Sequence, residues 1–294
     1  MSRAAAASQA ARPGGYPGNA AAGSRPHPTG RGSPATPSVE GQPPGAPGAC
    51  GACAALAAAL AHLLSHHAGG LAVAVADVST GAAASYHGTQ AFHTASIVKA
   101  GILAALLLQQ QRQHAALDPY HQALAAAMIE NSDNAAASAL WDTIGGAPGL
   151  AAADRALGLR HTVPGPGGWW GLTSTTVTDQ LRLLSALTSP QSPLAAPSGR
   201  YELALMRAVT AGQDWGVTAA ADPRTRPAVK NGWLPDGPAG LWVINSIGVV
   251  SRHGHRLLIA VLSSGQPSQQ AGIRQVQAAA TAAAAAITAA SPTR

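Results

Sequence analysis

The chain has 294 residues, of which 47% are hydrophobic and only 10% are charged, so it contains enough apolar material for one large domain. Its net charge is +6, but no stretch clusters basic residues with aromatic ones, which excludes the usual footprint of a nucleic-acid-binding protein. No apolar stretch reaches the length of a membrane-spanning helix, and we expect no transmembrane segment.

Residues 1–49 are rich in Pro, Gly, Ala and Ser and show no apolar periodicity. Such a composition cannot bury enough apolar surface to offset the entropy of ordering. We therefore predict a disordered leader over 1–49 and one folded domain over 50–294. The leader contains no apolar run typical of a signal-peptide core.

The first part of the predicted domain alternates between helical and strand patterns. Residues 54–64 have helical spacing, 71–78 alternate as in a strand, and 82–88 form a plausible second strand. Residues 96–113 are so apolar that we expect a helix buried on most sides. Short helices are then expected near 119–130, 134–144, 147–157, 175–188 and 198–211.

Strand patterns return late in the chain, at 227–233, 241–251 and 256–263, and an Ala-rich helix from about 268 to 289 follows. The three strands are typical of an antiparallel meander. The element order predicts an α/β (α+β) sandwich, in which N- and C-terminal helices flank a five-stranded antiparallel sheet. An all-helical subdomain, about 96–211, is inserted between parts of that sheet.

Only two lysines, Lys99 and Lys230, occur beside sixteen arginines. A lysine amine can be tuned to lose its proton, whereas an arginine cannot. Lys99 is the last residue of the motif S-I-V-K (96–99), so it lies about one helical turn from Ser96. A serine hydroxyl needs an adjacent base to become a nucleophile, and the start of a helix favours a developing oxyanion. Taken alone, the spacing fits an ordinary N-cap serine equally well.

Two further short motifs follow. S-D-N (132–134) comes after a predicted helix, and K-N-G (230–232) lies on a predicted strand directly before Trp233. Each alone is explained by common structure, since Ser, Asp and Asn are cap and turn residues and a strand lysine commonly faces solvent.

In this order, the three motifs resemble the signature of class A β-lactamases and penicillin-binding proteins. The resemblance spans about residues 52–290 and includes both lysines. It implies an active-site-serine acyl hydrolase that acts through an acyl-enzyme on a β-lactam or a related amide or ester. It implies no cofactor and no metal.

The resemblance also implies residue roles. Ser96 would be the acylated nucleophile, Lys99 its general base, and Ser132 the group that passes a proton to the departing nitrogen. Asn134 would bind the acylamino side chain of the substrate, and Lys230 would hold Ser132 and attract the substrate carboxylate. The backbone N–H groups of Ser96 and Trp233 would form the oxyanion hole, worth roughly 3 kcal/mol per donor. The implied substrate-binding set is Asn134, Lys230, Asn231, Gly232 and Trp233.

The chain departs from the family pattern in its deacylation machinery. Class A enzymes hydrolyse the acyl-enzyme with a glutamate on a loop after the second motif, but the three glutamates here are Glu40, Glu130 and Glu202. The corresponding loop, V-P-G-P-G-G-W-W-G-L (163–172), has no carboxylate. Asn231 also stands where the family has Ser or Thr. We therefore keep two alternatives open, a D-alanyl-D-alanine peptidase and a β-lactam or peptidoglycan sensor that stays acylated.

Two other features of the sequence allow more than one interpretation. Trp169 and Trp170 would either wall the substrate site or pack within their own loop. Cys50 and Cys53, followed by His62 and His66, have too short a gap for a zinc finger, and a local disulfide remains open.

The expected partner is a small-molecule or peptidoglycan-like acyl substrate, and a monomer is expected. The family usually works outside the cytoplasmic membrane.

Overall fold

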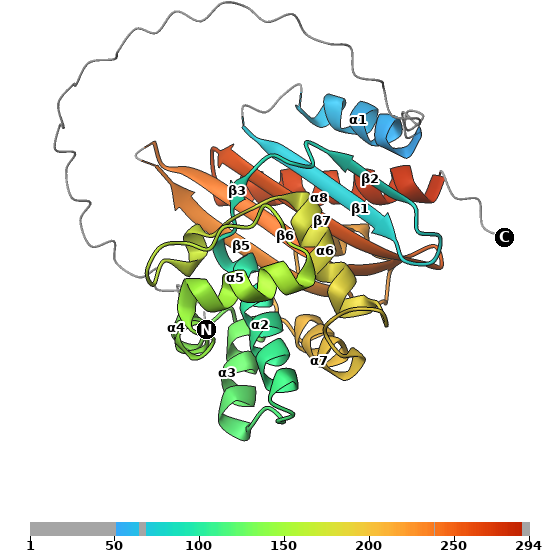
Figure 1. Ribbon diagram of the computed structural model, residues 1–294. Coiled ribbons are helices and arrows are strands. Elements are labelled where there is room, and N and C mark those ends of the chain that lie inside the picture. Colours follow the sequence, from blue (N-terminus) through green and yellow to red (C-terminus); the bar gives the residue numbers. More distant parts are fainter. Residues whose placement is uncertain (1–50, 65–68, 238, 290–294) are drawn as a thin grey trace, which may run out of the picture. The chain divides into compact units, whose positions relative to one another are not determined.

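The computed structural model describes residues 51–64, 69–237 and 239–289. It confirms the expected fold class, because a five-stranded antiparallel sheet lies between two layers of helices (Figure 1). The strand order across the sheet is β2-β1-β7-β6-β5. The predicted leader and Cys50 lie outside the described residues.

The sheet combines the two early strand patterns with the late meander. Because β1 pairs with β7 along its whole length, from Leu71 opposite Ser263 to Asp77 opposite Leu257, the first and last strands of the chain meet at the centre. The strands are β1 (Leu71–Asp77), β2 (Ala83–Tyr86), β5 (Ala228–Asp236), β6 (Leu241–Arg252) and β7 (His255–Gln266).

One face of the sheet is covered by α1 (Gly51–Leu64) and α8 (Gln269–Ala289), together with the short helix η3 (Gly216–Ala220). The contact face of α8 consists mostly of alanines, and those at 279, 280, 283 and 284 are fully buried. Alanine's small side chain lets a helix approach a strand face made of Val and Ile without leaving voids.

The helical subdomain covers the other face (Figure 1). Its central helix is α2 (Val98–Arg112), in which every residue from Val98 to Leu108 is buried. This agrees with the expectation of a helix buried on most sides. Around it lie α3 (Pro119–Glu130), α4 (Asn134–Thr143), α5 (Gly146–Leu157), α6 (Val177–Thr188) and α7 (Ala196–Arg207).

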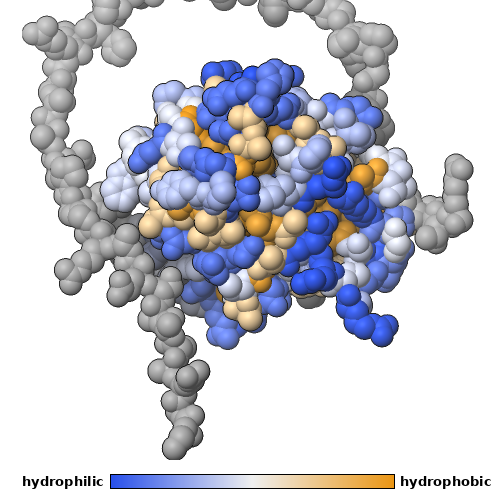
Figure 2. All heavy atoms as spheres, turned by 90° about the horizontal axis from the view of Figure 1, so that it is seen from below, coloured by the Kyte–Doolittle hydropathy of each residue, from blue (hydrophilic) through white to orange (hydrophobic). Residues whose placement is uncertain are grey.

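The surface of the subdomain mixes polar and apolar residues. Seen from below, apolar atoms form a broken band between hydrophilic residues (Figure 2). This fits a chain that has few charged residues with which to cover itself. Among the described residues, no helix combines the length and the apolar character that crossing a membrane requires.

Four short elements differ from the sequence-based expectation. A 3-10 turn, η1 (Ala95–Ile97), precedes α2, so Ser96 lies in this turn rather than in the α-helix. The two-residue strands β3 (Phe92–His93) and β4 (Ser174–Thr175) pair with each other, and the short helix η2 (Trp170–Leu172) comes just before β4. Elements of two or three residues are too short to produce a periodic pattern, so composition could not reveal them.

Candidate active site

The three motifs meet where β5 passes the start of α2. Ser132, in the turn between α3 and α4, lies between the two lysines of the chain: its Oγ is 3.2 Å from Lys99 Nζ and 3.0 Å from Lys230 Nζ. The three residues come from separate elements, α2, the α3–α4 turn and β5. One hydroxyl therefore connects both amines.

Lys99 is fully buried and has two more acceptors, the Ser132 carbonyl oxygen at 2.7 Å and Asn134 Oδ1 at 2.8 Å. Burial lowers the pKa of Lys99 from 10.5 to about 7, against the opposing effect of the negative charge on Asp133. A substantial fraction of this amine is therefore neutral near pH 7 and able to accept a proton.

Lys230 is 1% exposed, and its amine also donates to the Asn231 carbonyl oxygen at 3.1 Å. Burial lowers the pKa of Lys230 well below its ordinary value, and the nearby charge of Lys99 lowers it further. Two buried cations that share one hydroxyl disfavour each other's charged forms. This arrangement suits proton movement through Ser132 Oγ.

Two positions, one in the second motif and one directly before the first, have left-handed backbone. Ser132 has φ of +55° and Ala95, directly before Ser96, has φ of +49°. Such conformations strain a residue that has a Cβ, and the surrounding structure has to hold them. At Ser132 this is done by hydrogen bonds on the next residue, since the Asp133 N–H donates to Ala127 O and the Asp133 carboxylate caps α4 at the Ala136 N–H.

Ser96 is half-buried, and its hydroxyl makes no hydrogen bond with any described residue. Its backbone lies directly against Gly232, because a Cβ added at Gly232 would be 2.8 Å from the Ser96 nitrogen and 2.9 Å from the Ile97 nitrogen. Only glycine allows β5 to approach the turn this closely. Ser96 therefore lies directly against the third motif.

Asn245, on β6, is a positioning residue that the motif analysis missed. It is fully buried, and its amide donates to the carbonyl oxygens of His93 at 2.8 Å and Thr94 at 3.0 Å, while its Oδ1 accepts from the Ser263 N–H. It therefore fixes the segment that leads into Ser96. A lone Asn inside the apolar strand pattern 241–251 was the available signal.

Asn231 and Trp233 lie on the opposite face of β5 from Lys230, because neighbouring residues of a strand alternate. The Asn231 side chain is buried, and its amide donates to the carbonyl oxygens of Gln213 at 2.7 Å and Trp215 at 3.0 Å. The Trp233 ring packs beside that of Trp215, with centroids 6.1 Å apart. The structure thus brings Lys230 and Gly232 to the motif cluster, and the roles predicted for Asn231 and Trp233 stay predictions.

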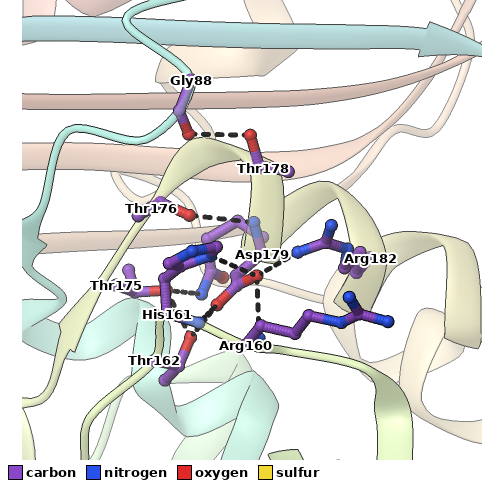
Figure 3. A network of polar contacts seen from close by, with 10 residues as sticks. Gly88, Arg160, His161, Thr162, Thr175, Thr176, Thr178, Asp179 and Arg182 are labelled. Carbon is purple, nitrogen blue, oxygen red and sulfur yellow. Dashed lines mark hydrogen bonds and ion pairs between the residues drawn. The ribbon is translucent and has the colours of Figure 1, made fainter. Parts of the chain in front are cut away.

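The loop after the second motif is held by a buried carboxylate (Figure 3). Asp179, in the first turn of α6, is fully buried and faces the loop segment 160–162. Its oxygens accept from the backbone N–H groups of Arg160 (3.2 Å) and His161 (2.6 Å), from Thr162 Oγ1 (3.0 Å) and from the Arg182 guanidinium (2.7 Å). Asp179 therefore anchors the loop to the start of α6.

Trp170 brings this loop into the site. Its ring lies over Lys99, with Nζ 4.9 Å from the ring centroid, and its indole N–H donates to Ser138 Oγ on α4 at 3.2 Å. The neighbouring Trp169 is 62% exposed. Of the two tryptophans, Trp170 is therefore the one that contacts a motif residue.

The weak zinc pattern gains no support from the part of the chain that the structure describes. Cys53 lies on α1, while Cys50 and His66 are outside the described residues. Within these residues, no group of three or more His, Cys, Asp or Glu side chains could hold a metal ion.

Comparison with known proteins identifies the family to which the chain is similar. The sequence model of the beta-lactamase enzyme family matches residues 55–121 and 119–290. The protein named "Putative lipoprotein LppW" is 31% identical over 212 residues, in both Mycobacterium tuberculosis and Mycobacterium bovis. That match covers 69% of this chain and 66% of the relatives, so it spans just under two thirds of their length.

Two solved structures share the fold. A variant of the class A beta-lactamase of the last common ancestor of Gram-negative bacteria has a TM-score of 0.69 and 25% identity, over 80% of this chain and 99% of that one. A class A beta-lactamase representative from Bacteroides cellulosilyticus has a TM-score of 0.71 and 18% identity, over 81% and 99% of the two chains.

Proposed function

The chain belongs to the beta-lactamase enzyme family, and on this premise we propose that it is an active-site-serine acyl hydrolase that forms an acyl-enzyme on Ser96. The substrate is a β-lactam or a related amide or ester. The observation that carries the proposal is the position of Ser132 Oγ between the buried amines of Lys99 and Lys230, because it links a base to a proton donor.

Acylation would proceed in two proton-balanced steps. Neutral Lys99 takes the proton of Ser96 Oγ as that oxygen bonds to the substrate carbonyl carbon. When the carbon–nitrogen bond breaks, Ser132 gives its proton to the departing nitrogen and is reprotonated by Lys99. The hydrogen bond of Lys99 to Ser132 Oγ at 3.2 Å supports this path, and a hydrogen bond between Ser96 Oγ and Lys99 is expected to form when substrate binds.

The groups around Lys99 and Ser132 would bind the charged and polar parts of the substrate. The backbone N–H groups of Ser96 and Trp233 would hold the developing oxyanion, each donor being worth roughly 3 kcal/mol. Asn134 is exposed and its Oδ1 contacts Lys99, so its amide nitrogen is available to an acylamino group. Lys230 would attract a substrate carboxylate.

A second candidate is favoured by the composition of the loop. Residues 160–175 contain no carboxylate, and Trp170 covers Lys99. An acyl-enzyme without a base for water has a long lifetime, which suits a sensor that stays acylated or a D-alanyl-D-alanine peptidase that β-lactams trap.

One experiment separates these outcomes: the full chain is incubated with a fluorescent penicillin, and its intact mass is followed over time. Turnover without a lasting adduct supports the hydrolase, and a lasting adduct supports the sensor or peptidase. Ser96→Ala should form no adduct, whereas the matched control Ser185→Ala, at an exposed serine on α6, should behave as the unmodified protein. An adduct that forms equally in Ser96→Ala, or no acyl transfer from any amide, lactam or ester substrate tested, would refute the proposal.

A further inference from the structure

The ring of Trp170 covers the amine that the proposed reaction uses as its base. Lys99 Nζ is 4.9 Å from the centroid of that ring, and the lysine side chain is completely buried. Three oxygen acceptors surround the amine: the Ser132 carbonyl, Ser132 Oγ and Asn134 Oδ1. The ring is an apolar cover over an otherwise polar pocket.

The cover is held in place. The indole N–H donates to Ser138 Oγ on α4, so the ring is tied to the helix that begins with the second motif. Its loop is fixed at one end by Asp179 and at the other by the Thr94 N–H, which donates to the Thr173 carbonyl oxygen at 2.8 Å. A ring anchored this way excludes water more effectively than one on a loose loop.

Water exclusion matters most for the second half of the reaction. Hydrolysis of acyl-Ser96 needs a water oxygen to attack the ester carbonyl, a base to take one water proton, and that proton to return to Ser96 Oγ as the ester bond breaks. Residues 160–175 contain no carboxylate, so this loop supplies no carboxylate base for the water, and Lys99 is the base that the proposed reaction already uses. That amine is fully buried, and the Trp170 ring covers one side of it.

Resting on the proposed function, we propose that Trp170 is a positioning residue that keeps water away from Lys99 and from acyl-Ser96, so that the chain acylates readily but hydrolyses its acyl-enzyme slowly. The same ring has opposite effects on the two half-reactions. It keeps Lys99 desolvated, which favours the neutral amine needed for acylation, and it withholds the water needed for deacylation.

The test uses the full chain, a fluorescent penicillin and two readouts: the pH midpoint of the acylation rate and the decay of the adduct by intact mass. Trp170→Ala should move the acylation midpoint from about 7 towards the ordinary lysine value of 10.5. Measured above the new midpoint, where Lys99 is neutral in both proteins, the adduct lifetime should also shorten by about tenfold, the effect of a modest change in barrier height.

Three matched variants separate the effect of the ring that covers Lys99 from the effect of the hydrogen bond that anchors this ring. Trp170→Phe keeps a ring but loses the hydrogen bond to Ser138, and Ser138→Ala loses the same bond but keeps the indole. Both should give lifetimes between those of the unmodified protein and Trp170→Ala. Trp169→Ala removes the neighbouring, exposed indole and should leave the acylation midpoint unchanged.

The outcomes distinguish this inference from the proposed function. If the unmodified chain neither forms an adduct nor hydrolyses any amide, lactam or ester tested, the proposed function fails. If it hydrolyses the penicillin without a lasting adduct, the proposed function stands and the role of Trp170 is refuted. If it forms an adduct, but the Trp170→Ala adduct decays at the same rate with an unshifted pH midpoint, the role of Trp170 is refuted. Should Trp170→Ala fail to fold, as judged by circular dichroism, unchanged lifetimes in both Trp170→Phe and Ser138→Ala would refute it equally.

Discussion

Gly232 of β5 lies against the backbone of Ser96, so closely that a Cβ at position 232 would be 2.8 Å from the Ser96 nitrogen. The same Cβ would be 2.8 Å from the Thr94 carbonyl oxygen and 2.9 Å from the Ile97 nitrogen, so the contact extends along the turn that contains Ser96. The sheet edge and the start of α2 therefore form one unit. A change at this contact has to move backbone, which cannot yield as a flexible side chain can.

Gly232→Ala should reduce acylation far more than it reduces stability. The added methyl group would displace the turn 95–97, and misplacing a nucleophile by about 1 Å costs roughly a hundredfold in rate. Stopped-flow measurement of acylation, beside thermal unfolding, checks this. Gly237→Ala is the control for glycine loss, because a Cβ there meets no atom within 4 Å, although its φ of +69° will cost some stability. An unchanged acylation rate in Gly232→Ala would contradict the close approach.

Asn245→Ala should lower both stability and acylation. It removes the donors to the His93 and Thr94 carbonyls, of which the Thr94 oxygen keeps the Ile97 N–H at 3.3 Å, and the loss of these two hydrogen bonds costs about 2 kcal/mol. The segment before Ser96 also loses its attachment to β6. Chemical denaturation and acylation kinetics measure the two effects. Asn131→Ala, the same change at an exposed residue, should alter the unfolding free energy by less than about 0.5 kcal/mol.

The acylation rate should rise with pH through about 7, because Lys99 accepts a proton only in its neutral form and burial lowers the pKa of Lys99 to about 7. Below that value the rate should fall about tenfold per pH unit, in proportion to the neutral amine. Lys99→Arg should abolish acylation, since a guanidinium does not deprotonate in this range. A rate that is flat from pH 5 to 8 would show that Lys99 is not the base.

Asp154→Asn should remove a pH dependence of stability. Asp154, on α5, is 3% exposed and its Oδ2 has no hydrogen-bond partner among the described residues. Burial raises the pKa of Asp154 to about 7, the negative charge of Asp179 adds to the rise, and Arg155 opposes it.

The sign follows from proton binding. Between pH 3.8 and about 7 the folded chain holds a proton on Asp154 that the unfolded chain has released, so the unfolding free energy falls as pH rises through this window. The slope is at most about 1.4 kcal/mol per pH unit. Denaturant unfolding at several pH values should show this slope in the unmodified chain and in Asp142→Asn, an exposed control, and should show it reduced in Asp154→Asn. Equal slopes in all three would contradict the prediction.

The long elements were predictable because their signal is local. The apolar spacing of 119–130 and 241–251 reproduces α3 and nearly all of β6, and the three-residue spacing of S-I-V-K places Lys99 close to Ser96 along the chain. The structure adds that the serine lies in a 3-10 turn, with Gly232 behind it.

By itself, the sequence determined the order of the elements and the motif residues, because both are patterns among neighbours within one or two turns. The three motifs in their order then indicated the family. Only the tertiary structure decided how these residues meet. Lys230 and Ser132 are 98 positions apart, Trp170 reaches Lys99 from a separate loop, and Asn245 holds a segment 151 positions earlier in the chain. Such contacts depend on how the sheet and the helical subdomain pack against each other, and no local pattern of residues records that packing.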